Sequence, residues 1–385
     1  SRWLNGVFAY SNADQMLMVE QLPFVRSVAR SQELQVQISE TKPPLEVWLS
    51  FDEEDLAKYQ VERLGDASFK GEGLDGKSVR VAIFDIGFKG AYTHPGLSHL
   101  YVKNQVVLTK NFLNSNKTVY GGGTHGTMVL GCLGGMMNQQ NLDLATGSEF
   151  LLARTEKASS GTNGKEQNWI AAAEWADKNG AAIISSSLVY TNQLYFADEM
   201  DGQTTIISKG AKIAAEKGIL IVNAAGNEGG IWWRIVGAPG DVEEVLTVGA
   251  TDPFSDAHAS YSSLGPTPDW RMKPNVSAPG LVVTTMNNRF KITQGTSFSA
   301  PLVAGFAACL RQKYPRLPVH ELFELIEKCS HLSPYFDYAH GYGIPQASNA
   351  LNGPEEIEPT FEMTAKPYKV SLSFNDEFLD ITDST

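Results

Sequence analysis

Short apolar runs alternate with helical stretches from about residue 79 onward, and this alternation restricts the possible fold more than any other feature. The pattern predicts strands at residues 79–85, 149–154, 181–188, 219–226 and 244–250. The segments HGTMVLGCLGG, NWIAAAEWADKNG and TTIISKGAKIAAEKG are typical of the helices between them. Continuous apolar strands separated by helices indicate a mostly parallel sheet covered on both faces. We therefore expect a three-layer α/β fold with its functional groups at the carboxyl ends of the strands.

Composition excludes some partners. The chain has 385 residues, is 42% hydrophobic and carries a formal net charge of -12, which argues against binding to nucleic acid or to anionic membrane surfaces. No apolar stretch approaches membrane-spanning length, so we expect no transmembrane segment. Cys132, Cys309 and Cys329 form no CxxC pair and lack zinc-ligand spacing. We expect buried free thiols, which leave the redox compartment open.

Shifts in composition divide the chain into four parts. Residues 1–30 have the pattern strand, helix, strand, in which Asn12 and Gln15 resemble a capping box. Residues 31–57 are polar and acidic, as in a linker, and residues 58–352 hold the α/β pattern. Residues 353–385 turn acidic and alternating, which indicates a β-rich module or a tail. The sequence starts at Ser1 without an initiator methionine or a leader, so we expect a processed product with its targeting signal upstream.

The segment GTSFSAPLVAG places Ser297 at the start of a predicted helix, among small residues and four positions before a proline. One interpretation is an N-cap, for which serine is a favoured residue. The other is a nucleophile held where helix N–H groups can stabilise an anion. The segment alone does not decide between them.

A serine nucleophile needs a base, and the base needs an orienting group. His125 lies among glycines in GGGTHGTMVLG, and Asp85 ends the apolar run VRVAIFD. Alone, His125 is explained by a histidine in a glycine-rich turn, and Asp85 by N-capping or turn formation. Together with Ser297 they follow the order Asp, His, Ser, which differs from the chymotrypsin order and from that of the α/β-hydrolases. The α/β-hydrolase elbow G-x-S-x-G is absent around Ser297, which disfavours an esterase of that fold.

The motifs FDIG, THGTMV and GTSFSAP resemble those of subtilisin-like serine proteases, the subtilase family, in its bacterial secreted form. The resemblance covers about residues 58–350. It implies a subtilisin-like fold and a serine endopeptidase that works through an acyl-enzyme on Ser297. His125 would then carry the proton, and Asp85 would orient the imidazole. Asn227, in NAAGNEGG, would stabilise the oxyanion, although asparagine is also a common loop residue.

The same resemblance implies residues that bind protein or peptide substrates. SSSLVY resembles the strand that lines the P1 pocket, which assigns Ser187, Leu188 and Val189 to substrate binding, and Gly226 joins them. ASSGTNG, with Ser160 and Gly161, resembles the edge on which substrate pairs as an added strand.

Three features depart from the family pattern. Ile86 replaces the usual Ser or Thr after the aspartate, which removes a possible hydroxyl hydrogen bond to the carboxylate. We therefore expect the carboxylate of Asp85 to be held less firmly. Val189 replaces a glycine and would narrow the P1 pocket. The strong calcium loop is not evident in MMNQQNLDLATG, and no cofactor is required. In the acidic turn DEMDGQ, calcium at Asp198 and Asp201 is an alternative to an acidic cap on the following helix.

Two other functions remain open: a binding or assembly protein on an inert scaffold of this fold, and a transferase or peptide ligase using the same acyl-enzyme. Retention of all four polar groups argues against the inert scaffold. Residues 1–30 resemble the second half of an inhibitory propeptide, which makes the chain's own N-terminal segment a partner of the catalytic domain. Family members with such a segment are usually exported, which implies a secreted or cell-surface location.

Overall fold

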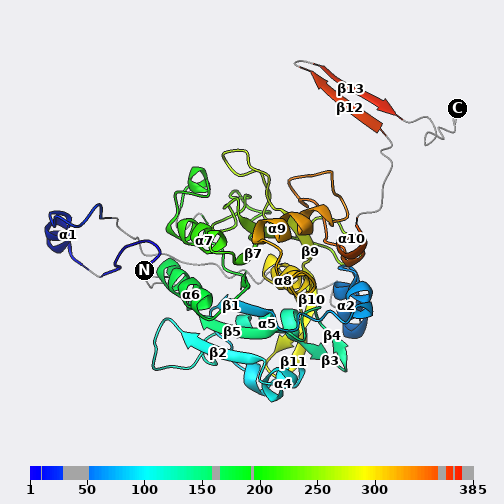
Figure 1. Cartoon of the computed structure of the whole chain (residues 1–385), viewed down its shortest axis with the longest axis horizontal. Helices are drawn as coiled ribbons and strands as arrows, with labels where there is room; N and C mark the ends of the chain where they lie inside the picture. The colour runs from blue at the N-terminus through cyan, green and yellow to red at the C-terminus, as the bar shows by residue number, and fades with distance from the viewer. Residues whose placement is uncertain are drawn as a thin grey trace.

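A seven-stranded sheet forms the centre of the molecule in the computed structural model, which describes residues 1–9, 11–28, 52–157, 165–191, 195–353, 361–366 and 369–374 (Figure 1). The strand order is β2-β5-β1-β6-β7-β8-β9, and every neighbouring pair is parallel. The strands are β1 (Arg80–Asp85), β2 (Val106–Asn111), β5 (Glu149–Arg154), β6 (Ile183–Ser186), β7 (Leu220–Ala224), β8 (Val245–Thr251) and β9 (Val276–Pro279). The predicted α/β class is confirmed, and β2 and β9 are strands that the sequence pattern missed.

Helices cover both faces of this sheet. The helices of the described ranges are α1 (Ala13–Glu20), α2 (Glu53–Glu62), α3 (Asp66–Gly71), α4 (Ser98–Val102), α5 (His125–Gly134), α6 (Lys165–Lys178), α7 (Ile206–Glu216), α8 (Thr296–Lys313), α9 (Val319–Lys328) and α10 (Ala347–Asn352), with short 3₁₀ turns η2 (Ala91–Thr93), η3 (Pro95–Leu97) and η4 (Ala197–Glu199). Two-stranded sheets are formed by β3 (Met136–Met137) with β4 (Gln140–Asn141), β10 (Leu281–Met286) with β11 (Arg289–Gln294), and β12 (Phe361–Lys366) with β13 (Lys369–Phe374). No helix in these ranges is both long and apolar enough to cross a membrane.

Strand β1 shows how the two faces are filled. Successive side chains of a strand point to opposite faces of the sheet. Val81 and Ile83 join the core on the side of α5 and α8, whereas Ala82 and Phe84 join the core on the side of α6 and α7. All four side chains are fully buried. The apolar run of β1 is therefore continuous because both of its faces are covered.

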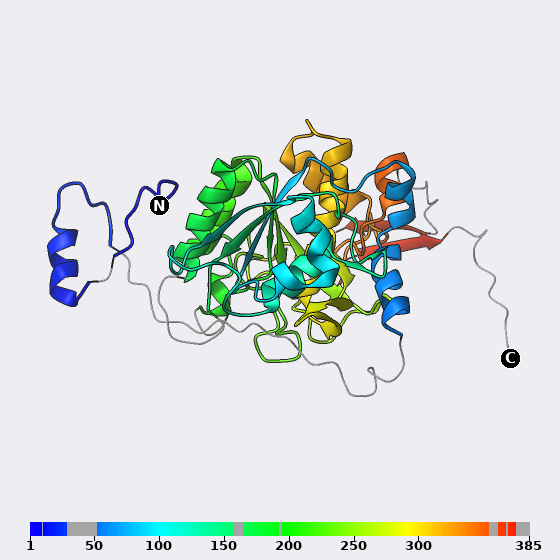
Figure 2. The same cartoon turned by 90° about the horizontal axis from the view of Figure 1, so that it is seen from below.

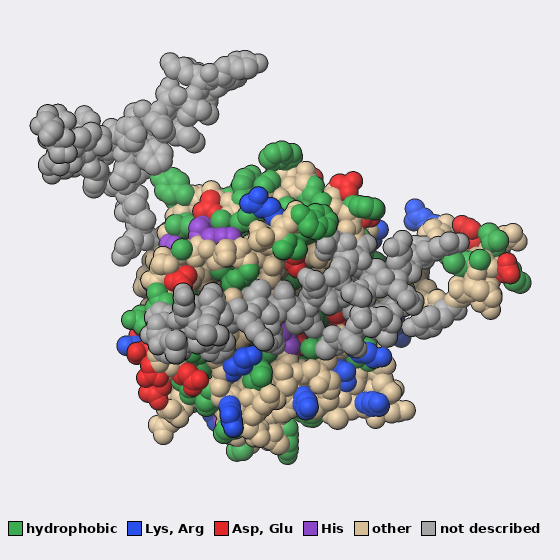
Figure 3. Space-filling view, turned by 180° about the vertical axis from the view of Figure 1, so that it is seen from behind, with side chains coloured by type: hydrophobic (Ala, Val, Ile, Leu, Met, Phe, Trp, Pro, Cys, Tyr) green, Lys and Arg blue, Asp and Glu red, His purple; other side chains and the backbone are tan. Residues whose placement is uncertain are grey.

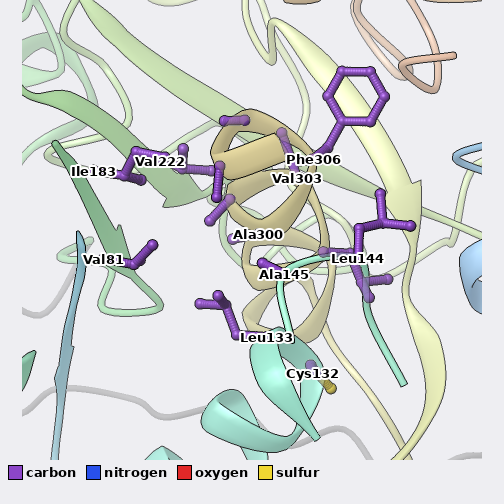
Figure 4. Packing of buried hydrophobic residues seen from close by; sticks show 14 of the residues in the cluster. Val81, Cys132, Leu133, Leu144, Ala145, Ile183, Val222, Ala300, Val303 and Phe306 are labelled. Carbon is purple, nitrogen blue, oxygen red and sulfur yellow. The ribbon is translucent and has the colours of Figure 1, made fainter. Parts of the chain in front are cut away.

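Helix α8 contains the longest run of buried residues among the described helices. Each residue from Thr296 to Leu310 is buried, and the helix packs against β6, β7, β8 and β9. Figure 4 shows its Ala300, Val303 and Phe306 among side chains of the sheet, α5 and the 144–145 segment. Burying a large apolar side chain stabilises a fold by about 1.5–3 kcal/mol. The position of α8 across the sheet is therefore strongly determined.

Residues 53–57 do not belong to a linker. They form the first half of α2, where Leu56 and Ala57 are fully buried against β10 and β4. Gln60 of the same helix accepts a hydrogen bond from the Val283 N–H at 2.8 Å and donates to the Leu142 carbonyl at 2.6 Å. The sequence suggested a linker because this stretch is acidic, but the acidic residues lie in the first turn of a helix, where negative charge is stabilising.

The N-terminal segment contains one of its three predicted elements. Helix α1 has the expected capping box between Asn12 and Gln15. The flanking strands are absent from the described residues 1–9 and 24–28. The first of them is replaced by a turn, in which the Gly6 N–H bonds to the Ser1 carbonyl and Asn5 has a positive φ of 47°. Figure 2 shows α1 at the opposite end of the molecule from α2.

Two further expectations concern the cysteines and the C-terminus. The three cysteines are buried and free, as predicted. Residues 361–374 contain the antiparallel hairpin β12–β13, while the division of the chain into domains stays a prediction.

A carboxyl group lies inside the core beside α8. Asp143 is fully buried, and a Cβ built on Gly305 of α8 would lie 1.8 Å from its Oδ2. Neither carboxyl oxygen reaches hydrogen-bond geometry with another group among the described residues. Burial raises the pKa of Asp143 well above its usual range, and the nearby N–H groups of Leu144 and Ala145 offset this only in part. The folded protein therefore favours the neutral acid.

We predict that Asp143→Asn stabilises the protein at pH 8. The pKa of Asp143 is higher in the folded state than in the unfolded state. The stability that the neutral acid contributes is therefore fully present below the unfolded pKa of about 3.9. This stability is lost as the pH rises toward the pKa of the folded state. The difference in Tm between the variant and its parent should therefore shrink toward pH 4. The measurement is thermal unfolding in a Ser297→Ala background, with the exposed Asp198→Asn as control. An equal Tm difference at both pH values would contradict the prediction.

Candidate active site

Four of the predicted site residues lie at one edge of the sheet. Asp85 is the last residue of β1, Ser187 follows β6, and Asn227 follows β7. Because these strands are parallel, their carboxyl ends lie at the same edge. Ser297 is the second residue of α8, which packs against the same strands.

Asp85 and His125 form a buried pair. Asp85 Oδ2 lies 2.8 Å from His125 Nδ1, and the two side chains are 0% and 2% exposed. The other oxygen, Oδ1, accepts the N–H of Ile86 at 2.7 Å. An ionised carboxylate can only accept hydrogen bonds, so Nδ1 is the donor in this contact. In a neutral imidazole the acceptor lone pair then lies on Nε2, the nitrogen that faces away from Asp85. This is the tautomer that a general base needs.

His125 lies beside the first turn of α8. The ring of Phe298, the residue after Ser297, has its centroid 5.7 Å from that of His125. Gly295 precedes the helix with a φ of 147°, a conformation that side chains rarely adopt. The glycine lets the chain turn from β11 into the helix at once, so Ser297 lies in the first turn and is 5% exposed.

The carbonyl of Ser297 has an unusual partner. In a regular helix this oxygen would accept the N–H of residue 301, but that residue is proline, which has none. The hydroxyl of Ser187 donates to it instead, at 2.8 Å. The proline thus leaves the Ser297 carbonyl free to accept from Ser187, and this bond ties the segment after β6 to Ser297.

Asn227 is oriented by Thr296. Its Oδ1 accepts both the Thr296 N–H at 2.9 Å and the Thr296 hydroxyl at 3.0 Å, which makes Nδ2 the opposite, donor end of the amide. Gly226 is required before it: its φ is +116°, and a Cβ there would lie 2.5 Å from Glu228 and 2.7 Å from Ser263. Sequence reasoning missed Thr296, although its position directly before Ser297 was a usable signal.

The remaining predicted residues have different outcomes. Leu188 is fully buried in the core on the side of α6 and α7. Val189 lies against Gly237, where a built Cβ would be 2.6 Å from its side chain. Its place in a P1 pocket stays a prediction. Ser160 and Gly161 lie outside the described residues.

The acidic turn before α7 contains Asp198 and Asp201. Asp198 is exposed, and Asp201 accepts hydrogen bonds from the N–H groups of Gln203 and Thr204. Partial burial acts to raise the pKa of Asp201, but these bonds and that of the Thr204 hydroxyl outweigh it and lower the pKa. Within the described ranges no group of three or more His, Cys, Asp or Glu side chains could hold a metal ion. Calcium binding here stays a prediction that the geometry does not support.

Comparison with known proteins decides the family. The model of the subtilase family matches residues 76–343, which include Asp85, His125, Asn227 and Ser297. The chain belongs to the subtilase family.

Several curated relatives are similar to this subtilase. It is 28% identical to subtilisin DY of Bacillus licheniformis over 274 residues, which cover 70% of this chain and 90% of the relative. It is 28% identical to subtilisin NAT of Bacillus subtilis subsp. natto, with 75% and 70% covered. A thermostable alkaline protease of Halalkalibacterium halodurans is 29% identical, with 66% and 63% covered. Family and relatives together identify the chain as a subtilisin-like serine endopeptidase.

We predict that Ser187→Ala destabilises this subtilase by about 1–3 kcal/mol, because the buried Ser297 carbonyl would lose its donor. The matched control is Ser185→Ala, two residues earlier in β6. The Ser185 hydroxyl is buried and makes no hydrogen bond within the described residues, so its removal should cost little or nothing. Urea unfolding in a Ser297→Ala background measures both. Equal losses in the two variants would show that the Ser187 bond does not contribute.

Proposed function

We propose that Asp85, His125 and Ser297 are the catalytic triad of this endopeptidase, and that Asn227 stabilises the oxyanion. The observation that carries the proposal is the buried 2.8 Å contact between Asp85 and His125 beside the first turn of α8. The oriented amide of Asn227 supports the fourth assignment, because a preorganised donor stabilises a developing negative charge without reorganisation.

In this mechanism the Ser297 hydroxyl attacks the carbonyl carbon of the scissile peptide bond while His125 Nε2 takes its proton. The oxygen of the tetrahedral intermediate accepts from Asn227 Nδ2 and from the backbone N–H of Ser297. Collapse breaks the C–N bond, and His125 gives the proton to the leaving amine. Water then attacks the acyl-enzyme by the same route. Throughout, Asp85 keeps the imidazole in one tautomer and stabilises its charged form.

The substrates are proteins or peptides in extended conformation. We assign Ser187, Leu188, Val189 and Gly226 to the P1 side of the site, with Ser160 and Gly161 on the strand-pairing edge. The bond from Ser187 to Ser297 supports this placement for the first of them, because it holds that segment beside the nucleophile.

A variant series with a fluorophosphonate probe tests the catalytic roles. Ser297→Ala should abolish probe labelling and peptide cleavage, and His125→Ala should nearly do so. The double variant should be little worse than either, as is known for subtilisin, because the triad acts as a unit. Asn227→Ala should lower kcat by about 10²- to 10³-fold with KM little changed, the loss known for the oxyanion donor of subtilisin.

The control for this series is Ser299→Ala in the same helix, where the hydroxyl bonds to the Pro279 carbonyl. It should keep its labelling. The triad would be contradicted if the activity losses of Ser297→Ala and His125→Ala multiplied in the double variant. Labelling of a residue other than Ser297 by the probe would also contradict it. A fully folded protein without labelling would favour the inert scaffold.

We further propose that residues 1–30 act as an inhibitory propeptide. Residues 1–4 contact the face formed by α6 and α7: the Trp3 N–H donates to Glu174, Lys217 lies over the Trp3 ring at 5.7 Å, and Leu4 packs nearby. Apolar side chains are exposed on the described part of the remaining segment, with Leu17, Met18 and Phe24 at 59%, 70% and 81%. Figure 3 shows hydrophobic side chains on the surface of the part of the chain that projects from the body of the molecule. A segment this short cannot build a core of its own, so its apolar surface needs a partner.

If this proposal holds, the active enzyme is cut between about residues 30 and 60, since a docked propeptide must be released before substrate enters. The Ser297→Ala variant should stay uncut unless another protease is supplied. N-terminal sequencing of both purified proteins makes the comparison. Wild type that keeps residues 1–30 at full peptidase activity would rule out an inhibitory role.

The location follows from the same family resemblance. We propose that the catalytic domain, predicted at residues 58–352 and extended to Glu53 by helix α2, acts outside the cell or at its surface, since subtilases with an inhibitor-like N-terminal segment are usually exported.

A further inference from the structure

Ile86, which replaces a hydroxyl residue after Asp85, is held more firmly than the sequence suggested. Its N–H bonds to Asp85 Oδ1 at 2.7 Å, and its carbonyl accepts the Nε–H of Arg154 at 2.8 Å. Its side chain is 4% exposed and lies directly over Gly123, where a built Cβ would be 2.2 Å from Ile86 Cδ1. The residue is thus fixed through its N–H, its carbonyl and its side chain.

Arg154 touches both of the segments that hold the Asp85–His125 pair. It ends β5 and is the register partner of Asp85 in the neighbouring strand. Its guanidinium lies against Gly122, where a built Cβ would be 2.5 Å from both Cζ and Nη2. Gly122 has a φ of +83°, so a side chain there would be strained as well as blocked. One side chain therefore spans the turn after Asp85 and the glycine loop before His125.

Backbone hydrogen bonds also join the same two segments. The Lys89 N–H bonds to the Gly123 carbonyl at 3.1 Å, and the Gly126 N–H bonds to the Gly87 carbonyl at 3.1 Å. Glycine loops have many conformations to lose, so a fixed neighbour contributes to holding them in one. A hydrogen bond from a charged donor is also stronger than one from a neutral donor.

We propose that Arg154 is a positioning residue for catalysis: by holding the Ile86 carbonyl and the loop at Gly122, it sets Asp85 Oδ2 against His125 Nδ1. The inference rests on the proposed triad. It explains how a chain without the family's hydroxyl after the aspartate orients its carboxylate. Arg154 itself touches no reacting atom.

The test is Arg154→Met in the full chain, assayed with a peptide substrate and normalised by fluorophosphonate titration of active sites. We expect kcat to fall about 10- to 100-fold with KM within about twofold, because a misplaced base slows the chemical step and not binding. The acidic limb of the kcat/KM profile should move to lower pH, because the imidazolium loses part of its stabilisation by Asp85. Arg154→Lys should recover part of kcat, since an ammonium group also donates to the Ile86 carbonyl.

Arg80→Met is the matched control, because Arg80 lies at the other end of β1 and pairs with Glu149, remote from both loops. Its kcat and pH profile should match wild type. The decisive measurement is the cycle with Asp85→Asn: Arg154→Met should cause little further loss in that background. Losses that multiply, a raised KM with kcat unchanged, or an unshifted pH profile would each overturn the inference.

The failure of this inference differs from the failure of the proposed function. If Asp85→Asn and His125→Ala lose activity while Arg154→Met keeps it, only the role of Arg154 is wrong. If Asp85→Asn and His125→Ala keep full activity, the triad itself is wrong. Should Arg154→Met fail to fold, the Lys variant gives the same kcat, KM and pH comparison.

Discussion

The burial of α8 across the parallel sheet is the constraint on which the rest of the site depends. Fifteen consecutive residues of a helix lie in the core, from Thr296 to Leu310, so its first turn cannot shift without disturbing the packing against four strands. Each other group of the site is placed relative to that turn. Asn227 bonds to Thr296, Ser187 bonds to the Ser297 carbonyl, and the His125 ring lies beside Phe298.

This placement also accounts for the residues around Ser297. Gly295 permits an abrupt entry into the helix, and Pro301 removes the N–H that would otherwise occupy the Ser297 carbonyl. Ser297 is not the N-cap of α8, because Gly295 is the residue before the helix and Ser297 lies inside it. The small residues near Ser297 are therefore explained by packing of the first turn against the ends of β6 and β7, and this packing brings the polar groups together.

The pair of Asp85 and His125 depends on a second set of contacts at the other side of the site. The carboxylate is oriented by one backbone N–H, and the residue that supplies it is held by Arg154 and Gly123. Glycines on both sides of His125 allow this close approach. A Cβ at Gly126 would lie 2.7 Å from the Gly87 carbonyl and 2.9 Å from the Asp85 side chain. The geometry of this buried hydrogen-bonded pair is thus produced by backbone contacts as much as by the two side chains.

The sequence by itself determined the α/β class, the strand at 149–154 and the helix that begins at His125, and it predicted the four polar residues of the site, because apolar periodicity and short motifs are local properties. It did not determine that residues 53–57 are helical and that Leu56 and Ala57 are buried, since an acidic helix start and an acidic linker have the same composition. The sequence also suggested that Ile86 weakens the hold on the Asp85 carboxylate. In the structure Arg154, 68 residues away along the chain, donates a hydrogen bond to the Ile86 carbonyl. Contacts of this kind arise only when β5 pairs with β1, because the register of two parallel strands decides which side chains meet and no local pattern encodes that register.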